Sequence, residues 1–461
     1  MSSVLGFFND FLSQPALLMG LMSFVGLVAL KRPGHKIMSG TLKPILGYLM
    51  LGAGADFITA NLNPLGEMIQ AGFHINGIIP NNEAITSLAQ TILGVETMSI
   101  LIVGLLVNLI VARFTKFKYI FLTGHHSLFM ACLLSAVLQT AGFNGVSLIA
   151  IGGIFLGVIS AILPAIGQKY TLKVTDGDDI AMGHFGSLAY YISAWIGSKV
   201  GKPEDSTENI EIPEKWSFLR DTTISTALTM MLFYLIAAIA AGPEFVAELS
   251  DGTNMILFAL MSAMKFAVGV TIVYSGVRMI LGDLLPAFQG IAMKVIPNAI
   301  PAVDCAVFFT YAQTAVVIGF VSSFIGGIIG MLILGAVGGV LIIPGLVPHF
   351  FCGATAGIYG NSTGGKKGAI IGSFINGLLI TFIPALLLPV LGNLGFQNTT
   401  FGDFDFGIIG ILIGKLYEYL GSVGVIGLLV ALVGCILAPN FLKTKTNVIN
   451  NYYEDEESET I

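Results

Sequence analysis

The stretch Gly145–Gly167, GVSLIAIGGIFLGVISAILPAIG, contains no Asp, Glu, Lys, Arg or His. A helix of about 20 apolar residues is long enough to cross the hydrocarbon core of a membrane. The composition agrees, because 55% of the 461 residues are hydrophobic and only 10% are charged, whereas soluble domains carry about 25% charged residues. The sequence therefore predicts an all-α polytopic membrane protein with little soluble mass.

Similar apolar runs recur along the chain and predict about eleven transmembrane helices. They lie near 15–30, 44–61, 97–113, 119–141, 145–167, 222–241, 254–276, 302–320, 323–346, 368–391 and 420–441. Lys and Arg are absent from alternate connecting segments, namely 62–96, 142–144, 242–253 and 392–406. Because basic residues gather on the cytoplasmic side, we predict an N-terminus outside the cell and a cytoplasmic C-terminus.

A weak internal similarity relates two parts of the chain. The run 44–61 leads into a segment with Pro64, and the run 254–276 leads into one with Pro286. The run 254–276 is the fifth predicted crossing after 44–61, so the two runs cross in opposite directions and the second copy would be inverted, as in many transporters. Chance similarity between two proline-containing loops is the alternative. The predicted organisation is one membrane domain over 1–445, followed by a disordered acidic tail over 446–461. Within the membrane domain, the two inverted repeats cover about 10–167 and about 222–391.

Two segments, 174–200 and 347–366, are too polar and too rich in glycine to be ordinary spans. Non-helical backbone at membrane depth is tolerated only where protein or a water-filled cavity surrounds it. We therefore expect re-entrant or broken helices that line a pathway. Within the second segment, GNSTGGKK (Gly360–Lys367) nearly matches a phosphate-binding loop. However, Lys367 stands where that motif needs Ser or Thr, and no strand precedes it, so we predict a glycine hairpin.

Ionisable residues within or beside the apolar runs are candidate functional residues, because they are costly in a membrane. They are His125, His126, His184, Asp304, Glu96, Asp56 and Lys265. Each has a structural alternative. Asp304 could cap a helix, His184 could cap its own turn, and the adjacent histidines could both be structural. Glu96 and Asp56 could lie at the outer membrane surface, and Lys265 could extend to the interface or pair with a carboxylate. We predict that His125 faces a substrate cavity and that His126 supports the structure.

The sequence offers little for a metal, a cofactor or a nucleic acid. The histidines lack HExxH spacing, adjacent histidines on a helix point about 100° apart, and the four cysteines show no CxxC pair. No GxSxG nucleophile motif and no basic stripe with interleaved aromatic residues is present. We therefore predict no metal, no cofactor and no nucleic-acid partner. The remaining histidines and carboxylates suit binding of a polar solute.

Four motifs carry a resemblance to a known family: LTGHH (122–126), VTDGDDIAMGH (174–184), AVDCA (302–306) and LIIPGLVPHFF (341–351). Together they resemble the ascorbate-type IIC permease of the bacterial phosphotransferase system, and the resemblance runs from Leu27 to about Ala438. It implies eleven spans, a core and a scaffold domain, and a homodimer among the lipids of the bacterial inner membrane. It also implies uptake of L-ascorbate, which a separate cytoplasmic IIB phosphocysteine protein, itself supplied by IIA, phosphorylates.

The resemblance implies that this chain is a transport component rather than an enzyme, and that it needs no cofactor. It assigns substrate binding to His125, His184 and Asp304, and less directly to Glu96. Histidine can donate to or accept from enediol oxygens, a protonated ring could pair with the anion, and a carboxylate accepts from sugar hydroxyls.

The chain departs from the family pattern at two positions. Glutamine is expected four residues after the first histidine and directly after the second, but Phe129 and Phe185 stand there. Unpaired polar groups cost about 1–3 kcal/mol each, so a related sugar acid or polyol is an alternative substrate. An ion-coupled secondary transporter, with Asp304 and a histidine as proton relay, is the alternative function.

Overall fold

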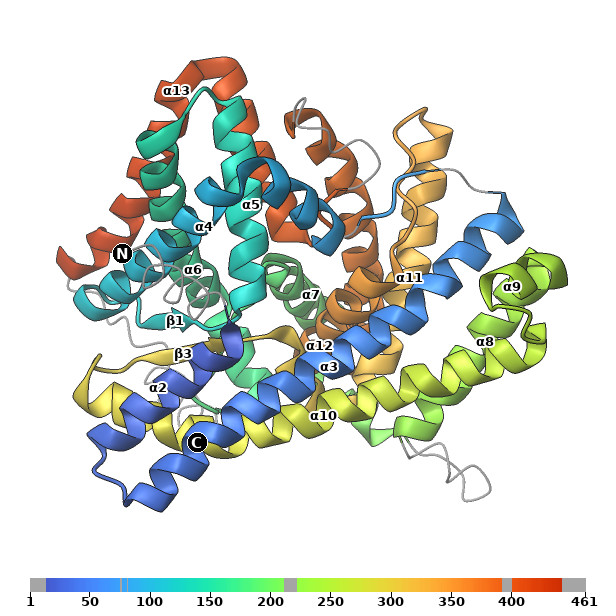
Figure 1. Cartoon of the computed structure of the whole chain (residues 1–461), viewed down its shortest axis with the longest axis horizontal. Helices are drawn as coiled ribbons and strands as arrows, with labels where there is room; N and C mark the ends of the chain where they lie inside the picture. The colour runs from blue at the N-terminus through green and yellow to red at the C-terminus, as the bar shows by residue number, and fades with distance from the viewer. Residues whose placement is uncertain (1–13, 75–76, 81, 211–221, 392–399, 442–461) are drawn as a thin grey trace.

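The computed structural model describes residues 14–74, 77–80, 82–210, 222–391 and 400–441. Almost all of these residues are helical (Figure 1), and seven of the described helices are long and apolar enough to cross a membrane, or eight if one bent pair counts as a span. This confirms the prediction of an all-α polytopic membrane protein. The predicted acidic tail, 446–461, lies outside the described residues.

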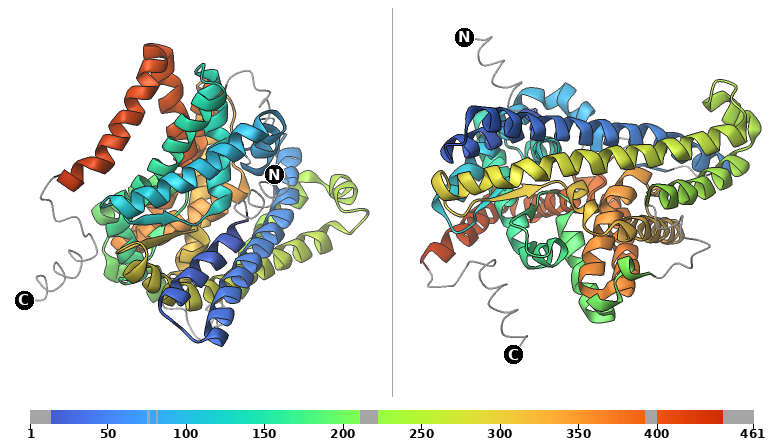
Figure 2. Two further views of the ribbon diagram at one scale, coloured as in Figure 1. Left: turned by 60° about the vertical axis from the view of Figure 1, so that its left-hand side comes forward. Right: turned by 90° about the horizontal axis from the view of Figure 1, so that it is seen from below.

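One layer of the molecule consists of two long helices with shorter helices packed on them. These are α2 (Pro15–Ala29), α3 (Gly34–Phe73), α8 (Thr222–Ala241), α9 (Pro243–Leu249) and α10 (Met255–Lys294). The helices α3 and α10 lie side by side along one face of the molecule, as both views in Figure 2 show. Gly54 and Gly269 permit this approach, because a Cβ on Gly54 would come within 3.0 Å of the Gly269 carbonyl oxygen.

The lengths of α3 and α10 correct two predicted boundaries. The helix α3 continues to Phe73 and contains Pro64, although the apolar run was expected to end at residue 61. Likewise α10 continues to Lys294, beyond the predicted end at residue 276. Proline within a membrane helix is tolerated because neighbouring helices and local adjustments satisfy the freed backbone groups. The inverted repeat itself remains a prediction.

A second layer holds the other helices. These are α4 (Asn82–Phe114), α5 (Gly124–Thr140), α6 (Gly145–Thr175), α7 (Ser187–Val200), α11 (Gln313–Ala336), α12 (Leu346–Leu387) and α13 (Phe404–Phe441). The described connecting segments contain four short 3₁₀ helices, at Pro203–Asp205 (η1), Thr207–Asn209 (η2), Cys305–Thr310 (η4) and Leu388–Val390 (η5). Contacts between the two layers are sparse compared with contacts inside each layer.

Two helices of the second layer break at a glycine. In α12, Gly365 has φ 56° and ψ −146°, and the Ser373 hydroxyl donates to the Gly353 carbonyl at 3.1 Å. The two halves of α12 therefore run antiparallel as a hairpin, which places a break within the predicted segment 347–366. In α13, Gly421 has φ 61° and ψ −159°, and the half before it was not predicted as a helix.

The apolar run 302–320 is not a membrane span. Its first residues complete the strand β3 (Ile300–Val303) and continue into η4. The helix α11 then covers the rest of this run and the first part of the run 323–346. The prediction of two separate spans here is therefore wrong. Hydropathy cannot distinguish a buried strand from a helical span when both are equally apolar.

Three short strands form a parallel sheet in the order β1–β3–β2, where β1 is Tyr119–Phe121 and β2 is Ala181–Met182. The register pairs Phe121 with Ala302 and Met182 with Val303. Beyond the strands, the Leu122 N–H donates to the Ala302 carbonyl at 2.9 Å, and the Gly183 N–H donates to Val303 at 2.7 Å. All of these strand residues are buried, so the sheet lies inside the second layer.

The hairpin turn of α12 leads to a stability prediction. A Cβ at Gly365 would lie 2.5 Å from the carbonyl oxygens of Lys202 and Asp205, whereas a Cβ at Gly421 would meet nothing within 4 Å. Both Gly365→Ala and Gly421→Ala should lose about 1–2 kcal/mol through their left-handed φ. Gly365→Ala should lose about 1–3 kcal/mol more through overpacking. Thermal unfolding in detergent measures the difference, and equal losses would contradict this account.

Candidate functional site

The carboxyl ends of the three strands bring together three of the residues predicted from sequence. His125 follows β1, His184 follows β2, and Asp304 directly follows β3. Because the strands are parallel, their carboxyl ends share one edge of the sheet. His125 Nε2 lies 3.4 Å from Asp304 Oδ2, and His184 Nε2 lies 4.0 Å from Asp304 Oδ1. One carboxylate thus lies between two imidazole rings.

Hydrogen bonds orient both rings. The Gly186 N–H donates to His184 Nδ1 at 3.1 Å, so this nitrogen must be an acceptor. In the neutral ring the proton is therefore on Nε2, which points at Asp304. The Tyr190 hydroxyl also lies 2.9 Å from His184 Nδ1. On the other ring, the hydroxyl of Tyr48 from α3 lies 2.9 Å from His125 Nδ1, which joins the two layers.

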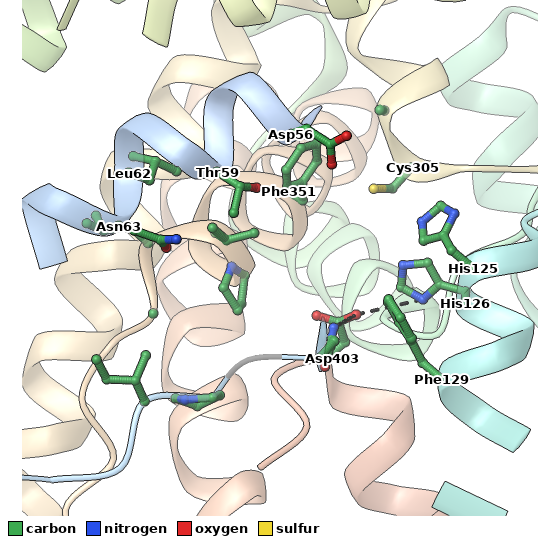
Figure 3. Close-up of a pocket in the computed structure, with 18 of the residues that line it drawn as sticks. Asp56, Thr59, Leu62, Asn63, His125, His126, Phe129, Cys305, Phe351 and Asp403 are labelled. Atoms are coloured by element: carbon green, nitrogen blue, oxygen red, sulfur yellow. Dashed lines mark hydrogen bonds and ion pairs between the residues drawn. The ribbon is translucent and has the colours of Figure 1, made fainter. Parts of the chain in front are cut away.

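These residues line a cavity of about 400 Å³ between the two layers. This volume lies within the range of about 300–1,000 Å³ that is typical of small-molecule sites. Figure 3 shows α3 on one side of the cavity and α5 on the other. The polar side chains that line it are Tyr48, Asp56, Thr59, Asn63, Asn82, His125, His126, His184, Asp304 and Asp403. No Lys or Arg is among the described residues that line it.

A second carboxylate, Asp403, was not identified from the sequence. Its Oδ2 lies 3.8 Å from His126 Nδ1 (Figure 3) and accepts a hydrogen bond from the Asn82 amide at 3.1 Å. The Cys352 thiol donates to its Oδ1 at 3.2 Å. The ring of His126 lies 3.7 Å from that of His184, measured between centroids. His126 therefore lies next to both Asp403 and His184 while it lines the cavity.

A third carboxylate, Asp405, holds the segment that carries His184. It is fully buried, and it accepts hydrogen bonds from the Ser187 hydroxyl at 2.8 Å and the Leu188 N–H at 3.1 Å. Asp405 thus caps the first turn of α7 from a distant part of the chain. The signal in the sequence was FGDFDFG (401–407), where two carboxylates interrupt an apolar stretch.

The remaining predicted residues lie elsewhere. Glu96 is half-buried in α4 and does not line the cavity, so the structure does not bring it to the other three. Asp56 lines the cavity from α3, whereas Lys265 is exposed on α10 away from it.

The two phenylalanines differ in position. Phe129 lines the cavity, but Phe185 does not. Instead Phe185 is fully buried and stacks on Phe121, with ring centroids 4.9 Å apart. Only one of these two aromatic replacements therefore makes the cavity wall more apolar.

Three groups of His, Asp and Cys side chains offer possible metal-ligand atoms within 4.8 Å of one another. They are His125 with His126 and Asp304, His126 with His184 and Asp403, and His184 with Asp304 and Cys305. Two groups depend on His184, whose Nδ1 accepts the Gly186 N–H and whose Nε2 then carries the proton. This pattern favours hydrogen bonding to a solute over coordination of a metal by His184.

Comparison with known proteins identifies the family. A family model described as the PTS system sugar-specific permease component matches residues 10–405. The chain belongs to this family. It is therefore the IIC membrane component of a phosphotransferase system, a multi-pass transport component that works with IIA and IIB proteins on a sugar substrate. The predicted resemblance to this permease family and the assignment as a transport component are confirmed.

A relative from Mycoplasma pneumoniae is named "Ascorbate-specific PTS system EIIC component". It is 27% identical over 447 residues, and the match covers 84% of this chain and 67% of the relative. The match agrees with membership of the same family. The name of the relative describes the substrate of that relative.

The cap supplied by Asp405 leads to a second stability prediction. Asp405→Ala leaves a hydroxyl and an N–H unpaired in a buried place, which should cost about 1–3 kcal/mol. The matched control is Glu208→Ala, because Glu208 also caps a helix, accepting from the N–H groups of Thr314 and Ala315, but is exposed. Water can replace that cap, so the control should lose less. Thermal unfolding in detergent compares them, and a larger loss in Glu208→Ala would refute the role of Asp405.

Proposed function

We propose that this IIC permease component translocates L-ascorbate or a related sugar acid to the cytoplasmic face of the membrane. The observation that carries the proposal is the Asp304 carboxylate between His125 and His184 on the wall of a 400 Å³ cavity. Imidazole groups suit the oxygens of an enediolate, and the carboxylate accepts hydrogen bonds from hydroxyl groups. The relative that is named for ascorbate supports this substrate class.

Movement between the layers provides the transport step in this proposal. The cavity lies where α3 of one layer faces α5 and the sheet edge of the other. Since contacts between the layers are sparse, one layer can shift against the other and open the cavity to alternate sides. The sheet and Asp304 would move as part of the second layer.

Phosphorylation by the IIB protein makes uptake irreversible. A sugar hydroxyl loses its proton and forms an O–P bond while the S–P bond of the IIB phosphocysteine breaks, and the proton and the released sulfur together restore the cysteine thiol of IIB. The product then carries about two more negative charges than the substrate. A cavity lined by carboxylates, with no Lys or Arg among its described residues, is a poor site for that product. The phosphorylated sugar acid therefore does not return.

We further propose an outside N-terminus, a cytoplasmic C-terminus, and a homodimer surrounded by lipid in the inner membrane of a bacterium. One packing feature supports the orientation. Gly201 packs against Gly364 with no room for a Cβ, so the basic segments at Lys199 and Lys202 lie at the same end as Lys366 and Lys367. The positive-inside rule assigns both segments to the cytoplasm.

Equilibrium binding to purified protein tests the substrate. Wild-type protein should bind L-ascorbate, and His125→Ala and Asp304→Asn should each weaken binding about tenfold to a hundredfold, because each removes a hydrogen bond to a charged group. Glu244→Gln, an exposed change on α9, is the matched control. Titration calorimetry with a thermal check of folding gives the affinities. Folded wild-type protein that binds no ascorbate would refute this substrate, and other sugar acids and polyols would then be screened.

Cellular uptake tests the phosphotransferase route. Cells with the permease and the IIA and IIB proteins should accumulate phosphorylated ascorbate, and deletion of the IIB gene should abolish accumulation. Collapse of the proton gradient at constant phosphoenolpyruvate should leave initial uptake unchanged. Accumulation of unmodified substrate that needs the proton gradient would instead support ion-coupled transport.

A further inference from the structure

One face of α3 forms a polar stripe along the cavity. The residues that line the cavity from this helix recur three or four positions apart, as one helix face requires. They include Tyr48, Gly52, Asp56, Thr59, Asn63 and Gly66. Figure 3 shows Asp56, Thr59 and Asn63 on α3, across the cavity from His125 and His126. The first layer, which contains α3, therefore presents its own polar groups to the cavity.

Asp56 differs from two other polar lining residues, Tyr48 and Asp403, in its partners. Tyr48 is hydrogen-bonded to His125, and Asp403 is held by Asn82 and Cys352. In contrast, no hydrogen bond or ion pair joins Asp56 to any other residue that the structure describes. An ionised carboxylate at a cavity surface can accept several hydrogen bonds, so Asp56 is available to a ligand.

The distribution of hydrogen-bond donors favours one orientation of an anionic ligand. The histidines among the described lining residues have ring N–H groups that can donate hydrogen bonds to an anion. His125, His126 and His184 all lie on the second layer, beside Asp304 and Asp403. On α3, the charged lining group is the carboxylate of Asp56. An anionic ligand can therefore accept hydrogen bonds from imidazole N–H groups on the second layer, whereas the Asp56 carboxylate offers it only acceptor oxygens.

We propose that Asp56 is a specificity residue that binds the hydroxyl-bearing side chain of the sugar acid. This assignment rests on the proposed function. The enediolate ring lies against His125 and His184, and the neutral side chain extends toward α3. Two adjacent hydroxyl groups can donate to the two oxygens of one carboxylate, which is a charge-assisted arrangement. L-Ascorbate has such a pair of hydroxyls on its side chain, at the end opposite to the enediolate.

This arrangement divides recognition between the two layers. The second layer selects the anionic ring, and α3 selects the uncharged, hydroxylated end. A sugar acid with an anionic group at both ends would be rejected, because its second charge would lie next to Asp56. A substrate that lacks side-chain hydroxyls would leave the Asp56 carboxylate without its partners. Asp56 therefore acts on selectivity, through one defined part of the ligand.

The assignment is tested by measuring two ligands against two forms of the full-length protein in detergent, in the manner of a double-mutant cycle. Binding of L-ascorbate and of 6-deoxy-L-ascorbate, which lacks one of the two hydroxyls, is measured for wild type and Asp56→Ala by titration calorimetry. Wild type should prefer ascorbate about tenfold. Asp56→Ala should bind ascorbate about tenfold more weakly and should lose most of that preference. Glu67→Ala is the matched control, because Glu67 is an exposed carboxylate of α3 that does not line the cavity.

The other outcomes are distinguishable. Weaker binding of both ligands by the same factor would mean that Asp56 acts on the whole site, which overturns the assignment. Tighter binding in Asp56→Ala would mean that the carboxylate repels the substrate, which also overturns it. Folded wild type that binds neither ligand would overturn the proposed substrate, and this assignment with it. Thermal unfolding of each variant shows that the comparison is made on folded protein.

Discussion

The structure depends on how backbone polar groups are satisfied where its membrane helices break. Peptide groups buried at membrane depth need hydrogen-bond partners inside the protein. Non-helical segments precede α5, α7 and α11. Their backbone N–H and C=O groups form hydrogen bonds with one another, because these segments pair as the strands β1, β2 and β3. The same pairing places His125, His184 and Asp304 at one edge. Fold stability and site geometry therefore have a common origin in these few hydrogen bonds.

The features that could be predicted from the sequence are those that depend on local composition. Apolar runs indicated the helices, glycine-rich polar segments indicated the breaks in 174–200 and 347–366, and rare ionisable residues indicated His125, His184 and Asp304. It did not predict the sheet, because strands of two to four residues are too short for a period and their partners lie far apart in the chain. It missed Asp403 and Asp405 for a related reason, since their partners are set by tertiary packing.

The cavity between two weakly connected layers explains why neither layer alone is a complete site. Tyr48 reaches across from α3 to His125, while Asp304 is held on the sheet side. A shift of one layer would break the Tyr48 contact and leave the His125–Asp304–His184 group intact, because its three members are attached to one sheet. Such a division suits a permease, which must keep recognising its solute while access changes from one side to the other.

Charge gives direction to this transport. The described wall of the cavity has carboxylates and histidines but no Lys or Arg, so the proposed enediolate substrate would find hydrogen-bond donors at the imidazole groups. A phosphorylated product has about two further charges and would face Asp304, Asp403 and Asp56 without a permanent cation to balance them. The absence of Lys and Arg from the described wall thus disfavours the proposed phosphorylated product more strongly than the proposed substrate, which carries less negative charge.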